Sequence, residues 1–214
     1  MSTHVKNKAI SITKLIETKF DVMELDGEWL DGIGDKPEMS GVWFIWGASA
    51  NGKSYGAMKL AKYLTRFSPV IYNDLEEGKR KTTQRAVKIL GIKDVARRFV
   101  LLNGETIEEL KQRLNKRKSP RIVFINSFQY VGFTKKQYIA FKEEFPNHLI
   151  IFISHAEGKH PEGKVAKFAR YDADVKIFCE GYKFFISSRY GGGKPVIISY
   201  ERAQKYWGEG GHDE

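Results

Sequence analysis

The chain has 214 residues, which is enough for one α/β domain with a substantial core and too few for two such domains and a linker. It carries 36 Lys and Arg against 26 Asp and Glu, a formal net charge of +10, and this excess favours an anionic partner such as nucleic acid. The single cysteine, Cys179, excludes an internal disulfide, and no apolar run approaches the roughly 18 residues of a transmembrane helix. The N-terminus has no signal-peptide core, so we expect a soluble cytoplasmic protein. We expect this protein to reside in a reducing compartment and to have no membrane partner.

Residues 1–40 have a mixed composition with no chemical motif. The stretch 9–16 favours a short helix or strand, and the stretch 26–37 is rich in Gly and Asp, which favours turns. We therefore predict an N-terminal cap segment over 1–40, a core over 41–207 and a disordered tail over 208–214.

A phosphate-binding motif follows the apolar run 42–46. The spacing from Gly47 is Gly, four residues, Gly-Lys-Ser, and apolar residues at helical spacing follow over 53–66. Strand, glycine-rich turn and helix form the context in which backbone N–H groups and a helix N-terminus bind phosphates. We expect Lys53 to reach the β- and γ-phosphates of ATP and Ser54 to hold Mg²⁺. The predicted nucleotide-binding residues are Gly47, Ala48, Ser49, Ala50, Asn51, Gly52, Lys53, Ser54 and Tyr55.

Strand-like and helix-like segments alternate after the motif. Further apolar runs lie at 70–72, 99–102, 122–125, 149–153 and 175–179, and helical patterns lie at 79–90, 106–117 and 135–145. This alternation predicts an α/β fold with a mainly parallel central sheet that is flanked by helices. The runs 182–189 and 195–200, joined through a glycine cluster, predict antiparallel strands appended at the C-terminal end.

Two polar positions follow strands beside the motif. Phosphoryl transfer needs a group that orients the attacking water and one that helps to hold Mg²⁺, and both should lie at the carboxyl ends of strands. Glu76, with Glu77 as neighbour or substitute, follows the run 70–72. The run 122–125 ends at Asn126, where the Walker B strand of a P-loop protein should end with Asp.

The departure at Asn126 leaves three possibilities. An amide oxygen can accept a hydrogen bond from a Mg²⁺-bound water, but it supplies no negative charge. Hydrolysis is then slow, or Asp74 or Glu77 compensates, or the protein is an ATP-binding switch with little turnover.

The order of these segments resembles the ATPase core of the RecA superfamily, on its RadA and DnaB-helicase side. The resemblance covers about residues 41–200 and continues through 151–159, 172–178 and 188–191. It implies that Glu76 activates water and that His155 senses the γ-phosphate. It also implies that Arg189 acts as an arginine finger on the nucleotide of a neighbouring subunit, although this chain has Ser187 where relatives carry a Lys.

Two segments are candidates for nucleic-acid contact, because the corresponding loops line the DNA channel in the RecA superfamily. The first, 128–136, and the second, 157–170, combine aromatic and basic residues, as single-strand binding requires. Glycine and proline in the second segment favour a mobile, exposed loop. The basic run 111–118 is an alternative, although it ends a helix and is also typical of a solvated face. The predicted DNA-binding residues are Phe128, Tyr130, Lys135, Lys136, Lys159, Lys164, Lys167 and Arg170.

The sequence thus predicts a RecA-like ATPase that uses ATP and Mg²⁺ and self-associates as a ring or filament on single-stranded DNA. Its expected role lies in recombination, repair or replication, and its size resembles small phage-type recombinases. One alternative is an ATP-gated DNA-binding or loader protein with little or no hydrolysis. Another is a small-molecule P-loop kinase, which the net charge disfavours.

Overall fold

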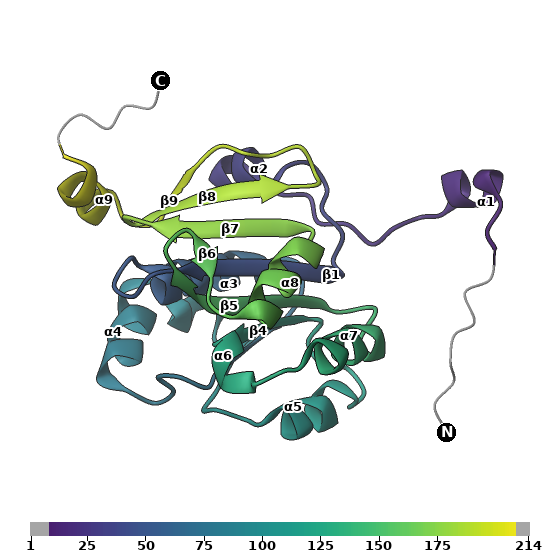
Figure 1. The fold of residues 1–214 in the computed structure, drawn as a ribbon, viewed down its shortest axis with the longest axis horizontal. Helices are drawn as coiled ribbons and strands as arrows, with labels where there is room; N and C mark the ends of the chain where they lie inside the picture. The colour runs from purple at the N-terminus through teal and green to yellow at the C-terminus, as the bar shows by residue number, and fades with distance from the viewer. Residues whose placement is uncertain (1–8, 209–214) are drawn as a thin grey trace.

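A mainly parallel β-sheet forms the centre of the molecule in the computed structural model, which describes residues 9–208 (Figure 1). Its strand order is β3-β2-β4-β5-β1-β7-β8-β9, and β6 pairs with the end of β5. Strands β1 to β5 and β7 pair in parallel, whereas β8 and β9 are antiparallel additions. The strands are β1 (Gly41–Gly47), β2 (Val70–Asp74), β3 (Phe99–Leu102), β4 (Ile122–Asn126), β5 (Leu149–Glu157), β6 (His160–Pro161), β7 (Val175–Glu180), β8 (Lys183–Ser188) and β9 (Val196–Ile197).

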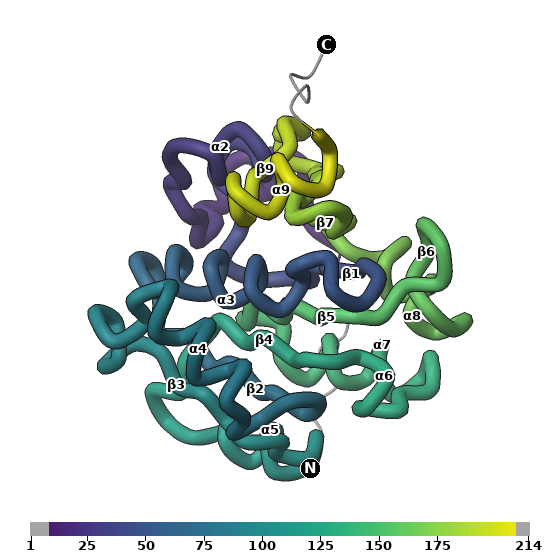
Figure 2. The backbone as a smooth tube through the Cα atoms, turned by 90° about the vertical axis from the view of Figure 1, so that its left-hand side faces the viewer, coloured from purple at the N-terminus to yellow at the C-terminus, as the bar shows by residue number. Residues whose placement is uncertain are grey.

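Helices cover both faces of this sheet (Figure 2). Side chains alternate along each buried strand, so that Trp43 and Ile45 of β1 join one core and Val42 and Phe44 join the other. Helices α2 and α3 contribute to the first core, and α5, α7 and α8 to the second. The helices are α1 (Ile12–Glu17), α2 (Gly27–Ile33), α3 (Lys53–Leu64), α4 (Lys81–Ile89), η1 (Ile92–Val95), α5 (Ile107–Leu114), α6 (Phe128–Val131), α7 (Lys135–Glu144), α8 (Lys164–Asp172) and α9 (Tyr200–Trp207).

This architecture confirms the predicted fold class. Each of the six expected parallel strands is present, and the antiparallel β8 and β9 follow them. The stretch 195–200 forms only the two-residue strand β9 before helix α9 begins at Tyr200. No helix within the described range 9–208 combines the length and apolar character needed to cross a membrane.

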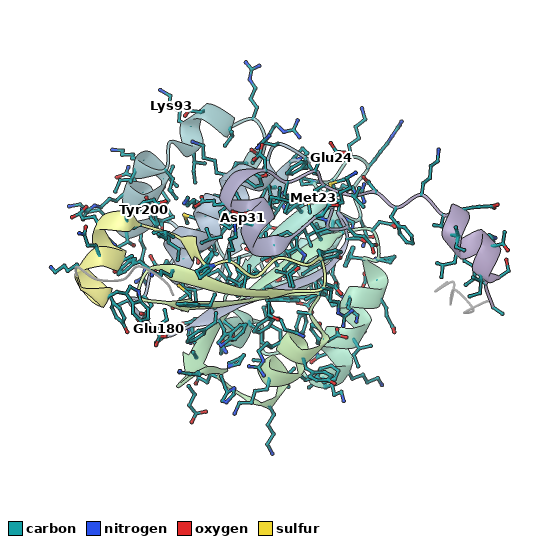
Figure 3. All side chains as sticks on the ribbon, turned by 90° about the horizontal axis from the view of Figure 1, so that it is seen from above. Met23, Glu24, Asp31, Lys93, Glu180 and Tyr200 are labelled. Carbon is teal, nitrogen blue, oxygen red and sulfur yellow. The ribbon has the colours of Figure 1, made fainter. Side chains whose placement is uncertain are left out.

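The N-terminal segment divides into two parts. Residues 26–37, predicted as turns, contain helix α2, which packs against β8 and buries Trp29 and Ile33. Helix α1 has no buried residue and projects away from the sheet, whereas α2 with Asp31 lies over it (Figure 3). The predicted tail lies outside the described residues except for Gly208.

The segment after β5 corrects one expectation. Residues 157–170 were expected to form a mobile loop, but they form the short hairpin of β5 with β6 and then helix α8. Ala166 and Ala169 anchor this helix, because both side chains are buried against the sheet. Helix α8 therefore holds its basic residues at fixed positions on a helix surface.

Candidate nucleotide-binding site

The predicted P-loop connects β1 to α3 at the carboxyl end of the parallel strands. Gly52 has a φ of +88°, and a Cβ atom there would lie 2.5 Å from the ring of Tyr182. Only glycine accommodates both the backbone conformation and this contact. The side chain of Asn51 accepts a hydrogen bond from Gly181 N at 2.8 Å, and its carbonyl accepts one from Tyr182 N at 3.1 Å. The turn between β7 and β8 thus holds the loop in place.

A cleft of about 400 Å³ opens beside this loop. That volume falls within the range of small-molecule sites, about 300–1,000 Å³. Helix α4 contributes to the lining of the cleft, and so do Tyr182 and Arg202. The Arg202 guanidinium lies 5.3 Å from the Tyr182 ring centroid. The lining residues of the P-loop and α3 are Ala48, Ser49, Ala50, Gly52, Lys53, Ser54, Tyr55 and Met58.

Lys53 is a buried cation at the start of α3. Its side chain is only 9% exposed, and within residues 9–208 no carboxylate lies within 4 Å of its Nζ atom. Burial lowers the pKa of Lys53, and the nearby charge of Glu76 opposes this effect. A buried ammonium without an ion pair is unfavourable unless an anion binds beside it. The chain therefore has the cradle and the cation that a nucleotide phosphate would need.

Glu76 lines the same cleft and contacts His155, which is not among the lining residues. Glu76 lies just after β2, His155 lies on β5, and Glu76 Oε2 is 3.0 Å from His155 Nε2. The other ring nitrogen of His155 lies 3.5 Å from the carboxylate of Glu162, so the imidazole stands between two acids. Gln129 accepts a hydrogen bond from the His155 backbone N–H at 3.1 Å. This network connects the cleft to α6 and to the hairpin before α8.

Asp74 and Asn126 lie side by side at the ends of β2 and β4. Asn126 Nδ2 donates a hydrogen bond to Asp74 Oδ1 at 2.9 Å, and the backbone N–H groups of Glu76 and Glu77 donate to the same oxygen. Burial raises the pKa of Asp74, and these three donors, together with the backbone N–H of Gly78, oppose that effect. Asp74 lines the cleft, whereas the fully buried Asn126 is not among the lining residues.

The position of Arg189 separates it from this cleft. It follows β8, whose end pairs with the first residue of β7, so it lies at the amino end of the parallel strands. Its guanidinium pairs with Asp174 at 2.9 Å and stays largely exposed. Strand β1 spans roughly 20 Å at about 3.3 Å per residue, so Arg189 cannot contact a nucleotide on its own P-loop.

The predicted DNA-binding segments lie next to each other. Lys135 at the start of α7 lies 4.1 Å from the centroid of the Phe168 ring on α8. The backbone carbonyl of Lys159 accepts a hydrogen bond from the indole N–H of Trp46. Arg170 lies over the same indole ring. We call this region the α8 surface; its residues are Tyr130, Lys135, Lys136, Lys159, Lys164, Lys167 and Arg170.

One predicted DNA contact is wrong. Phe128 is 4% exposed and packs among the rings of Phe44, Phe133, Tyr138 and Phe152. A base cannot stack on a side chain that the core encloses. Tyr130, two residues later, is 60% exposed and retains the geometry for such a contact.

Several residues that line the cleft were not predicted from the sequence. Thr82, Thr83, Arg85, Ala86 and Ile89 belong to α4, and Tyr182 and Arg202 lie far along the chain. No motif marks them, although Gly181 before Tyr182 is a turn signal.

Comparison with known proteins identifies no family. No family model matches the chain, and no curated protein matches its sequence. Solved structures do match its fold, and one of them is the flagellar accessory protein FlaH from Methanocaldococcus jannaschii. The two share 16% sequence identity, the match covers 85% of this chain and 96% of FlaH, and the TM-score is 0.62. At this identity the likeness concerns the fold alone, and the chain has a RecA-like α/β fold, an architecture consistent with P-loop ATPases in general.

Proposed function

We propose that the chain is a Mg²⁺-dependent ATPase that acts on single-stranded DNA. The observation that carries this proposal is the cleft lined by both Glu76 and Lys53, a buried cation that has no ion pair within residues 9–208. Glu76 in turn contacts His155. The cation and the P-loop provide for binding of phosphates, and the carboxylate provides for activation of water. Binding and hydrolysis both require these groups close together, and the shared cleft of Lys53 and Glu76 supports this part of the proposal.

Each residue has a distinct role in this proposal. Backbone N–H groups of the P-loop and Lys53 bind the phosphates, and Ser54 with the adjoining polar groups holds Mg²⁺. The metal ion, when bound, neutralises charge on the transferred phosphoryl group. Glu76 accepts a proton from the attacking water, and His155 orients the Glu76 carboxylate across their 3.0 Å contact.

The α8 surface supports the DNA-binding part of the proposal. Lys164, Lys167 and Arg170 occur at intervals of three residues on one helix, so they lie along one stripe of its surface. Exposed lysines that follow a phosphate backbone and an exposed tyrosine on which a base stacks are the elements of single-strand binding. His155 contacts Glu162, two residues before α8, and Glu76 in the cleft, so these two contacts connect the start of α8 with the nucleotide cleft.

The position of Arg189 supports self-association. An exposed arginine at the opposite end of the sheet from the P-loop acts on a nucleotide only if a second subunit presents its cleft there. We therefore include assembly into a ring or filament in the proposal, with Arg189 completing the site of the neighbouring subunit. A role in recombination, repair or replication belongs to the same proposal.

The test is the rate of ATP hydrolysis with and without a single-stranded oligonucleotide. We expect hydrolysis that the oligonucleotide stimulates severalfold. ATP binding without turnover would instead favour the ATP-gated binding protein, and turnover indifferent to DNA would favour a metabolic enzyme. No ATP binding at micromolar to millimolar concentrations would refute the proposal as a whole.

A further inference from the structure

We propose that Asp74 supplies the carboxylate of the magnesium site in this chain and that Asn126 positions it. The inference rests on the proposed ATP-binding function. It accounts for the absence of a carboxylate at the end of β4, the position where the sequence led us to expect a Walker B Asp. The negative charge lies instead at the end of the adjacent strand.

The register of the sheet places the two residues together. Strands β2 and β4 pair in parallel, and the last residues of the two strands, Asp74 and Asn126, are partners in the register. They are 52 residues apart in sequence, and their side chains meet through a 2.9 Å hydrogen bond. A charge moved from position 126 to position 74 therefore stays within the same small volume.

The two side chains differ in their access to the cleft. Asp74 is 2% exposed and lines the cleft together with Lys53 and Ser54. Asn126 is fully buried, outside the lining, and donates its amide N–H to Asp74. Of this pair, Asp74 is thus the one that faces a nucleotide-bound cation.

The hydrogen bonds at Asp74 fix its orientation, and the backbone N–H of Gly78 also stabilises the carboxylate. Asn126 and the backbone N–H groups of Glu76 and Glu77 all donate to Oδ1. Charge-assisted bonds of this kind hold a carboxylate in one rotamer. Asn rather than Asp at position 126 is required for this arrangement, because a second carboxylate at that distance would repel the first.

A buried acceptor without a partner points to a further ligand. Oδ1 of Asn126 is fully buried and has no hydrogen-bond partner within the described residues 9–208. A buried polar atom left without a partner costs about 1–3 kcal/mol. A hydrated Mg²⁺ ion brings water molecules that donate hydrogen bonds, and Mg²⁺ usually keeps several of them when it binds beside phosphates.

The other two acids beside the P-loop are already engaged. Glu76 contacts His155 at 3.0 Å, and Glu77 accepts a hydrogen bond from the Thr82 hydroxyl at 2.7 Å. Their side chains serve the proposed water-activating pair and the start of α4, respectively. This leaves Asp74 as the carboxylate best placed for the metal ion.

A charge-swap experiment tests the proposal. The dissociation constant of a fluorescent ATP analogue is measured with Mg²⁺ and with EDTA for the wild type, Asp74→Asn, Asn126→Asp and the double variant. We expect Mg²⁺ to tighten binding by the wild type, Asp74→Asn to reduce that tightening at least tenfold, and the double variant to restore it to within about threefold. Binding of Mn²⁺ in the presence of ADP, followed by electron paramagnetic resonance, gives a second readout that does not depend on turnover.

Asp74→Asn is nearly isosteric and can keep an oxygen at the Oδ1 position, and circular dichroism of each variant verifies folding. Full Mg²⁺ dependence in Asp74→Asn would overturn the proposal, and so would a double variant no better than Asp74→Asn. If Asp74→Asn does not fold, the proposal is decided by the double variant alone, from how much Mg²⁺ tightens its binding of the ATP analogue. If the wild type binds ATP equally well in EDTA, the proposed metal site is overturned and the proposed ATP binding stands. If the wild type binds no ATP, both proposals are overturned.

Discussion

The α8 surface allows a quantitative prediction about DNA binding. Lys159, Lys164 and Lys167 are exposed, and substituting all three with Gln removes three positive charges without removing a buried group. Gln and Lys have similar helix propensities, and α8 is anchored by buried alanines, so the helix should remain folded. Any loss of DNA affinity then reports on charge.

The expected magnitude follows from counterion release. Each phosphate neutralised on a single strand contributes about −0.7 to the slope of log affinity against log salt concentration. Three lysines that each contact one phosphate contribute about −2, so the triple variant should have a slope shallower by about 2 units. Between 50 and 200 mM salt, this difference corresponds to a roughly 20-fold smaller loss of affinity in the variant than in the wild type.

The assay is fluorescence anisotropy of a labelled oligothymidine over a series of salt concentrations. A matched control substitutes Lys116, Arg117 and Lys118 with Gln, since these residues are also exposed and the charge change is the same. We expect the control to retain the wild-type slope. Equal slopes for the wild type and the α8 variant would refute the assignment of the DNA site, and a reduced slope only in the control would move the site to the end of α5.

Three further predictions concern the cleft and the core. Glu76→Gln should preserve ATP binding and reduce the hydrolysis rate about 10²–10⁴-fold, because the amide cannot accept the proton of water; an unchanged rate would exclude Glu76 as the base. Phe128→Ala should lower the free energy of unfolding by about 3–5 kcal/mol in urea denaturation, since the side chain packs among four rings, whereas Tyr130→Ala should leave it nearly unchanged. Burial raises the pKa of the Cys179 thiol to about 12, so iodoacetamide at pH 8 should label the protein only after unfolding.

The elements that the sequence predicted correctly have strong local patterns. The P-loop motif, its preceding strand and helix α3 depend on residues that are close together in sequence, and the buried strands are nearly continuous apolar runs. Helix α8 was missed because Gly158, Pro161 and Gly163 suggested a loop, and its buried residues are the two small alanines Ala166 and Ala169. Helix α2 contains glycines that disfavour a helix, and burial of its apolar side chains against β8 overrides that preference.

The candidate site was predictable only in part, for a similar reason. Motif spacing indicated Lys53 and Glu76, and the structure brings them to one cleft. The pairing of Asp74 with Asn126 depends on which strands become neighbours in the sheet, and chain order does not specify this. Arg202 reaches the cleft from the C-terminal helix, so long-range packing rather than a motif places it there.

The central claim is that the cleft beside the P-loop binds ATP through Lys53. Isothermal titration of ATP with Mg²⁺ into the wild type and into Lys53→Ala tests it most directly, because this substitution removes the buried cation that the phosphates would pair with. We predict saturable binding by the wild type at one site per chain and a loss of affinity of at least tenfold in the variant, with an unchanged circular dichroism spectrum. Equal affinity of the two proteins for ATP would contradict the account.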